Sequence, residues 1–266
     1  LAAIFEAPNI EESSKLIGNL IVSESSSDVQ TSDMRELDNS TTGEPSNSAL
    51  TTGEWTPLVA LQAKGSRLPF FCMHGAGGNV LNFHLLSTKL GEDQPFFGLQ
   101  AQGVDGKLPP LESIEQMAEI YIDAVKTVQP EGPYLLGGYS GGGIVALDMA
   151  RQLAGKGEEI GLLVFLDTFA PRLPKRSYTV GEKLRLLWDL GIQGWLRLRL
   201  DIEIERFKRY QVWNNLRKGK PVPLQLRETY LMNSFVQTQV KYDPKDPYLG
   251  PIHLLTAERV NVIHEH

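Results

Sequence analysis

Residues 137–143 read GGYSGGG, which places one hydroxyl side chain among residues that are nearly all glycine. The central five match G-x-S-x-G, the pattern of a serine nucleophile on a sharp strand-to-helix turn. Apolar residues from Tyr134 predict a strand before it, and residues 142–153 predict a helix after it. Because the pattern requires this context, we predict that Ser140 is a nucleophile. The alternative is a glycine-rich turn of the kind found in nucleotide-binding folds.

A serine nucleophile needs donors that stabilise the oxyanion formed when it attacks a carbonyl. The turn supplies one candidate, the backbone N–H of Gly141 at the start of the following helix. A second turn of small residues, 75–78, follows another apolar strand, and Ala76 within it is the candidate for the second N–H donor. Gly138 and Gly142 are expected to let the strand and the helix approach closely.

The serine also needs a base and an acid that orients this base. Asp167 closes a very apolar strand that begins at Ile160. A carboxylate is costly to bury there without a partner, so we predict that Asp167 is the acid. A cap for the following segment is the alternative. Strand ends in a parallel sheet line one crevice, so Asp167 and Ser140 should lie at the same edge.

The base should follow the acid along the chain. His253 is expected inside a strand and therefore to be structural, whereas His264 and His266 come after the last short strand, where the base belongs. His266 is our candidate for the base, with His264 or a histidine beyond the chain as alternatives. His74 precedes the serine, so we expect it to hold the loop at residues 75–78 by a hydrogen bond.

From about residue 56 the chain alternates apolar strands with helices. Strands are predicted at residues 69–74, 95–101, 134–138, 160–167, 251–257 and 260–263, and helices at 83–90, 113–129 and 142–153. This order with short links predicts an α/β fold, with a mostly parallel sheet flanked by helices.

Residues 172–245 interrupt this alternation and predict an insertion over the sheet. Residues 196–205 alternate apolar and charged residues with period 2, which formally predicts a strand, although their flanks predict helix. Residues 172–220 hold thirteen Lys and Arg against five Asp and Glu, a local charge of +8. This charge could dock an acidic partner, and a solvated helical face is the alternative.

Two segments precede the sheet. Residues 1–20 predict a short helix capped by Asn9, too short to fold alone. Residues 21–54 contain thirteen Ser and Thr, seven acids, one base and no aromatic residue, which predicts a disordered linker. This segment alone carries the net charge of −6 of the whole chain, so the acidity says nothing about the substrate.

The single cysteine, Cys72, excludes an internal disulfide and fits a reducing compartment, so we expect a cytoplasmic location. No apolar run is long enough to span a bilayer, and no secretory signal is visible at Leu1. A start without Met suggests a piece of a longer polypeptide. We expect no membrane, no nucleic acid and no metal among its partners.

Three motifs carry a resemblance to a known family. HGAGGN (74–79), LLGGYSGGGIVALDMARQL (135–153) and LVFLDTFAP (163–171) resemble the α/β-hydrolase thioesterase domain that ends modular nonribosomal peptide and polyketide synthases. LAAIFEAPNIEESSKLI (1–17) is similar to the last third of a carrier protein of those assembly lines.

The resemblance implies three parts: a carrier remnant at residues 1–20, a linker at 21–55, and a thioesterase domain of α/β-hydrolase fold at 56–266. Residues of about 172–245 would form its lid, in which Trp188, Trp195 and Trp213 would line an acyl tunnel or form the lid core.

The resemblance also implies a chain-releasing thioesterase. Ser140 would take an acyl or peptidyl chain from a carrier, Asp167 would orient His266, and Ala76 with Gly141 would form the oxyanion hole. The substrate would arrive on the phosphopantetheine of an upstream carrier domain in the same polypeptide, and the thioesterase itself would need no cofactor. The alternatives are a free-standing esterase or lipase of this fold, and a hydrolase-like binding domain without activity.

Overall fold

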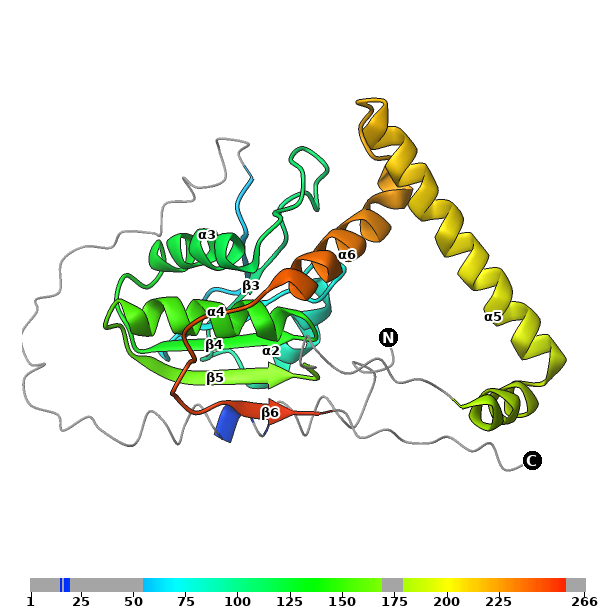
Figure 1. Ribbon diagram of the computed structural model, residues 1–266. Helices are drawn as coiled ribbons and strands as arrows, with labels where there is room; N and C mark the ends of the chain where they lie inside the picture. Colours follow the sequence, from blue (N-terminus) through cyan, green and yellow to red (C-terminus); the bar gives the residue numbers. More distant parts are fainter. Residues whose placement is uncertain (1–14, 16, 20–54, 169–178, 257–266) are drawn as a thin grey trace, which may run out of the picture.

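The computed structural model of the 266-residue chain describes residues 15, 17–19, 55–168 and 179–256. Within these residues, a six-stranded sheet has the strand order β1-β3-β2-β4-β5-β6 (Figure 1). Its strands are β1 (Leu58–Gln62), β2 (Phe70–Met73), β3 (Phe96–Leu99), β4 (Tyr134–Tyr139), β5 (Ile160–Leu166) and β6 (His253–Leu255). Neighbouring strands run parallel except β1 and β3, which confirms the predicted mostly parallel sheet.

Helices lie on both faces of the sheet. On the faces lie α2 (His84–Leu90), which follows a 3-10 turn at Leu81–Phe83, then α3 (Ile114–Lys126) and α4 (Gly142–Gly155). Two further helices, α5 (Val180–Arg217) and α6 (Leu224–Lys241), belong to the insertion. The first three confirm the predicted helices between strands. Ser113 caps the N-terminus of α3, because its hydroxyl accepts a hydrogen bond of 3.1 Å from the Gln116 N–H.

The core has two parts, one on each face of the sheet. Strands β2, β3 and β4 are buried over their whole length, as their continuous apolar runs require. Helices α3 and α4 pack on one face. The other face holds Phe83 and Leu86, together with Ile17, which is 0% exposed. Residue 17 therefore lies in the core of the sheet domain, although the proposed cap at Asn9 is outside the described residues.

The insertion is helical, so the strand interpretation of residues 196–205 is wrong. These residues lie inside α5, which bends at Gly191, where φ is 61°. With 3.6 residues per turn, Leu196, Leu200 and Ile204 fall on one face of a helix and the intervening apolar residues on another, so the alternation also fits a helix. Residues 196–207 are all exposed, and no neighbouring strand is described that could pair with them.

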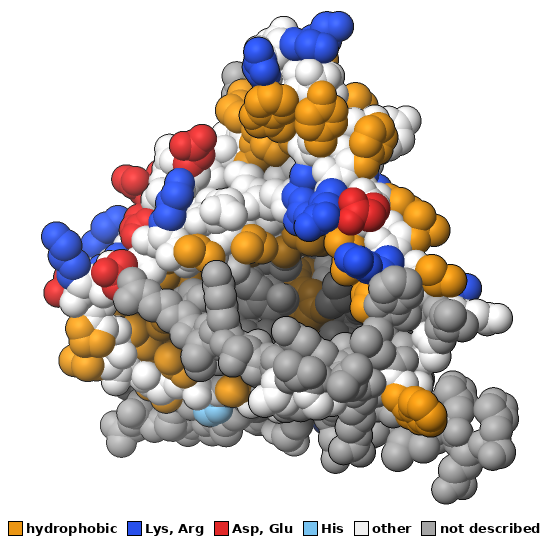
Figure 2. All heavy atoms as spheres, turned by 45° about the vertical axis from the view of Figure 1, so that its right-hand side comes forward, with side chains coloured by type: hydrophobic (Ala, Val, Ile, Leu, Met, Phe, Trp, Pro, Cys, Tyr) orange, Lys and Arg blue, Asp and Glu red, His pale blue; other side chains and the backbone are white. Residues whose placement is uncertain are grey.

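Helices α5 and α6 rise away from one end of the sheet (Figure 1). Hydrophobic side chains with Lys and Arg beside them gather on the surface of this corner (Figure 2). Trp188 is 87% exposed and Trp213 is 51% exposed, so neither lines a closed tunnel or forms a lid core. Trp213 instead packs on the ring of Tyr210 and under the Arg217 guanidinium. The side chain of Trp195 is outside the described part.

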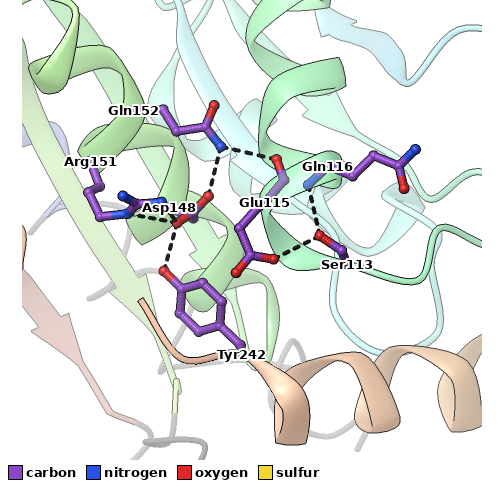
Figure 3. A network of polar contacts seen from close by, with 7 residues as sticks. All are labelled: Ser113, Glu115, Gln116, Asp148, Arg151, Gln152 and Tyr242. Carbon is purple, nitrogen blue, oxygen red and sulfur yellow. Dashed lines mark hydrogen bonds and ion pairs between the residues drawn. The ribbon is translucent and has the colours of Figure 1, made fainter. Parts of the chain in front are cut away.

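A buried carboxylate ties the end of α6 to α4. Asp148 is completely buried and accepts a hydrogen bond of 2.8 Å from the Tyr242 hydroxyl, just after α6 (Figure 3). Arg151 and Gln152, one turn further along α4, also donate to this carboxylate, at 2.9 and 2.8 Å. Because the charge of Asp148 is paired, its burial is tolerated, and the network fixes where α6 returns to the sheet domain.

Candidate active site

Ser140 stands on a strained turn between β4 and α4. Its φ is 52°, a region that side chains other than glycine rarely adopt. A Cβ at Gly138 would collide with the backbone of Gly142, and a Cβ at Gly142 would collide with the carbonyl of His74. These close approaches confirm the prediction that the two glycines let the strand and the helix meet.

Ser140 and Asp167 lie side by side at the carboxyl edge of the sheet. The Ser140 N–H donates to the Leu166 carbonyl at 2.8 Å, directly before Asp167. Asp167 also has a positive φ, of 51°, and its N–H donates to the Leu255 carbonyl at 2.7 Å. Burial, and after it the nearby negative charge of Asp167, raise the pKa of Tyr139, the residue before Ser140. The predicted placement at one edge is confirmed.

The loop of small residues comes to the same edge because β2 lies next to β4. The Gly78 N–H closes the turn on the Gly75 carbonyl at 3.0 Å, and the Gly78 carbonyl accepts from the Ala101 N–H at 2.8 Å. Among the described residues, the N–H groups of Ala76 and Gly141 have no acceptor. Both donors therefore fit the oxyanion role that the sequence predicts for them.

His74 holds this loop, as expected, and is a poor base. It is buried, with Nδ1 2.6 Å from the Gly75 carbonyl oxygen and Nε2 2.9 Å from the Tyr121 hydroxyl. Its ring also lies against that of Phe235, with centroids 5.1 Å apart. Burial lowers the pKa of His74 to about 4, so the ring stays neutral at pH 7 and both nitrogens remain engaged.

We expect the free energy of unfolding to fall as the pH drops from 6.5 to about 4, the ordinary and the folded pKa of His74. Between pH 6.5 and about 4, His74 binds a proton in the unfolded chain but stays neutral in the folded chain. The contribution of His74 is therefore complete above pH 6.5 and lost as the pH approaches 4. This contribution to the free energy of unfolding is about 3 kcal/mol, at ~1.4 kcal/mol per pKa unit. Urea unfolding of wild type and His74→Gln at pH 7.5, 5.5 and 4.5 measures it, and an equal pH dependence of the two would contradict this assignment.

Helix α6, part of the insertion expected over the sheet, covers the turn and the loop, but the sequence did not predict which of its side chains lie there. Leu231 approaches Gly78, so that a Cβ at this glycine would lie 3.1 Å from Leu231 Cδ1. A Cβ at Gly141 would lie 2.7 Å from Phe235 Cε1 and would collide with the side-chain nitrogen of Gln239. The helix has no local pattern that marks these side chains, because its apolar residues are also those expected of ordinary packing.

Of the histidines after Asp167, the structure describes His253 but not His264 or His266. His253 is the first residue of β6 and pairs with Val164, so its predicted place in a strand is confirmed. His264, His266 and the strand predicted at residues 260–263 lie outside the described residues. Within the described part of the chain, no group of three His, Cys, Asp or Glu side chains could hold a metal ion.

The fold has relatives of known structure. The NocB thioesterase domain, solved in covalent complex with a fluorophosphonate nocardicin G analogue, superposes with a TM-score of 0.52 and 22% identity, over 75% of this chain and 77% of that chain. Together with the parallel sheet and the serine turn, this similarity defines an α/β-hydrolase fold. Residues 68–197 match the family model of the thioesterase domain. Over these residues the chain is similar to the thioesterase domain family.

Two proteins show where related sequences occur. The chain is 34% identical over 139 residues to an inactive atromentin synthetase of Paxillus involutus, and 44% identical over 112 residues to a dimodular nonribosomal peptide synthase of Bacillus subtilis. These matches cover 52% and 42% of this chain, but only 14% and 5% of the two synthetases. The chain thus corresponds to a small part of long synthetases, over a portion of thioesterase size.

Proposed function

We propose that this domain is a chain-releasing thioesterase, which moves an acyl or peptidyl chain from a carrier thioester onto Ser140 and releases it by hydrolysis or cyclisation. The observation that carries the proposal is the strained turn, which presents Ser140 beside Asp167 at the edge where the Ala76 and Gly141 N–H groups lie. The match of residues 68–197 to the thioesterase family model supports the same reaction class.

In the proposed reaction a histidine, with His266 as the candidate, removes the proton from Ser140 Oγ while this oxygen attacks the thioester carbonyl carbon. The carbonyl oxygen becomes an oxyanion that accepts hydrogen bonds from the Ala76 and Gly141 N–H groups. The carbon–sulfur bond then breaks, and the histidine returns the proton to the leaving thiol. Water, or a nucleophile within the chain, then attacks the carbonyl carbon of the acyl-enzyme ester while the histidine takes its proton. The bond from this carbon to Ser140 Oγ breaks, and the histidine gives the proton to Ser140 Oγ. Asp167 orients the histidine throughout.

The proposal includes a carrier domain in the same polypeptide, whose phosphopantetheine delivers the substrate. Its support is the multidomain nature of the related synthetases and the similarity of residues 1–17 to a carrier tail. Exposed basic residues on α5, such as Arg197 and Arg209, are candidates for docking an acidic carrier, although Arg206 is already paired with Glu203 at 2.9 Å. None of the described helices is long and apolar enough to cross a bilayer. A cytoplasmic location stays a prediction from the single cysteine.

A binding domain without activity is the second candidate, because one of the related synthetases is named as inactive. A free-standing esterase of the same fold is the third. The arrangement of Ser140 and Asp167 favours an active enzyme over the binding domain, and the long multidomain relatives argue against the free-standing esterase.

Matched substrates distinguish these candidates. The chain is incubated with an acyl N-acetylcysteamine thioester and with the ethyl ester of the same acid, and release of thiol or alcohol is measured. We expect turnover of the thioester, faster than that of the oxoester. Turnover of the oxoester alone would favour the free-standing esterase. No turnover of either substrate by a folded chain would favour the binding domain.

A further inference from the structure

Gln239 carries an unused hydrogen-bond donor beside the proposed oxyanion site. Its Nε2 atom is buried and has no partner among the described residues. The same atom lies so close to Gly141 that a Cβ added to this glycine would collide with it. Buried amide N–H groups are rarely left without an acceptor, so an orphan donor in a candidate active site calls for an acceptor that arrives with a ligand.

The position of Gln239 is set by contacts on both sides of it along α6. One turn earlier, Phe235 packs its ring on His74, at the start of the loop that carries Ala76. Three residues later, the hydroxyl of Tyr242 donates to the buried Asp148 of α4 (Figure 3). Because both anchors join α6 to the sheet domain, the Gln239 amide is held at Gly141.

We propose that the Gln239 amide N–H donates a hydrogen bond to a carbonyl oxygen of the acyl chain transferred to Ser140. The inference rests on the proposed thioesterase function, because it needs an acyl chain at Ser140. Two oxygens have the required chemistry. One is the oxygen of the reacting carbonyl, which becomes the oxyanion beside Gly141. The other is an amide carbonyl further along a peptidyl chain.

The two possible acceptor oxygens predict different losses of kcat/KM when Gln239 is replaced. If Gln239 donates to the oxyanion, its replacement lowers kcat/KM for every thioester by about 10²–10³-fold, as does the loss of one donor of an oxyanion hole. If Gln239 donates to an amide carbonyl, its replacement lowers kcat/KM only for substrates that carry this amide. The expected loss is about tenfold, the effect of one neutral hydrogen bond. In both cases the neutral donor contributes only while substrate is bound.

The test compares Gln239→Leu with wild type on an acetyl thioester and an N-acetylglycyl thioester of N-acetylcysteamine. Gln239→Glu is a second variant, which keeps the shape of the side chain but removes the donor. Gln237→Leu is the matched control, since Gln237 is exposed on the same helix. Thermal unfolding of each variant checks the fold, and kcat/KM is measured for each substrate.

We expect Gln239→Leu and Gln239→Glu to lower kcat/KM while Gln237→Leu leaves it unchanged. Loss on both substrates assigns the donor to the oxyanion, and loss on the N-acetylglycyl substrate alone assigns it to the amide carbonyl. Wild-type rates on both substrates in the two Gln239 variants would overturn the inference and leave the thioesterase function intact. No Ser140-dependent turnover by wild type would overturn both.

Discussion

Ser140→Ala is expected to lose the covalent adduct that wild type forms with a fluorophosphonate, and to lower kcat/KM on thioesters by about 10⁶-fold. In wild type, Ser140 Oγ displaces fluoride and forms an oxygen–phosphorus bond, which intact-mass spectrometry detects as a gain of the phosphonyl group. Alanine has no nucleophilic atom, so the adduct cannot form, and any remaining turnover must come from direct attack of water on the thioester. The Ser140→Ala variant should keep its fold, because serine and alanine have a similar conformational strain at the observed φ of 52°.

Ser234→Ala is the matched control for this experiment, because Ser234 lies half-buried on α6, outside the proposed machinery. It should keep both the adduct and the rate. An adduct of equal extent in wild type and Ser140→Ala would place the reactive group elsewhere and refute the nucleophile assignment. Equal melting temperatures of the three proteins would exclude unfolding as the cause of a lost adduct.

Asp167→Asn is expected to lower kcat/KM by about 10⁴-fold, because an amide favours the wrong tautomer of the histidine base. Asparagine tolerates a positive φ, so it should adopt the observed value of 51° and preserve the turn. The measurement is kcat/KM on the thioester together with the melting temperature. Asp123→Asn, at an exposed site on α3, is the control that should change neither. Full activity of Asp167→Asn would contradict its role as the orienting acid.

The same assay locates the base. His266→Ala should lower kcat/KM at least as much as Asp167→Asn, because it removes the imidazole that Asp167→Asn only misorients. His264→Ala should retain activity. The reverse result would assign the base to His264. Full activity of both histidine variants would mean that neither is the base.

Most of the sheet domain could be predicted because its signals are local. Continuous apolar runs indicate strands buried on both faces, and apolar residues at spacings of three and four indicate α3 and α4. The site followed from the same logic. Once β4 and β5 are parallel neighbours, the residues that end them, Ser140 and Asp167, must share one edge. Glycines at 138 and 142 identified the strained turn from sequence alone.

The insertion was harder to predict because short periodic patterns are ambiguous. Residues 196–205 alternate as a strand would, but they form part of α5, in which alternate residues divide between two faces of a helix. Local sequence cannot decide between the two, since a strand also needs a neighbour to pair with. The expected burial of Trp188 and Trp213 was wrong for a related reason, because burial depends on what packs against a helix.

The sequence by itself determined the α/β fold, the serine turn and the partners that a serine nucleophile needs, because these depend on residue types and spacings over a few turns of chain. The tertiary structure alone decided which side chains of α6 meet that turn. Phe235 reaches His74 and Gln239 reaches Gly141 across about a hundred residues or more of intervening chain. Such contacts follow from the path of the insertion and from the Tyr242–Asp148 bond that anchors it, and no local pattern encodes that path.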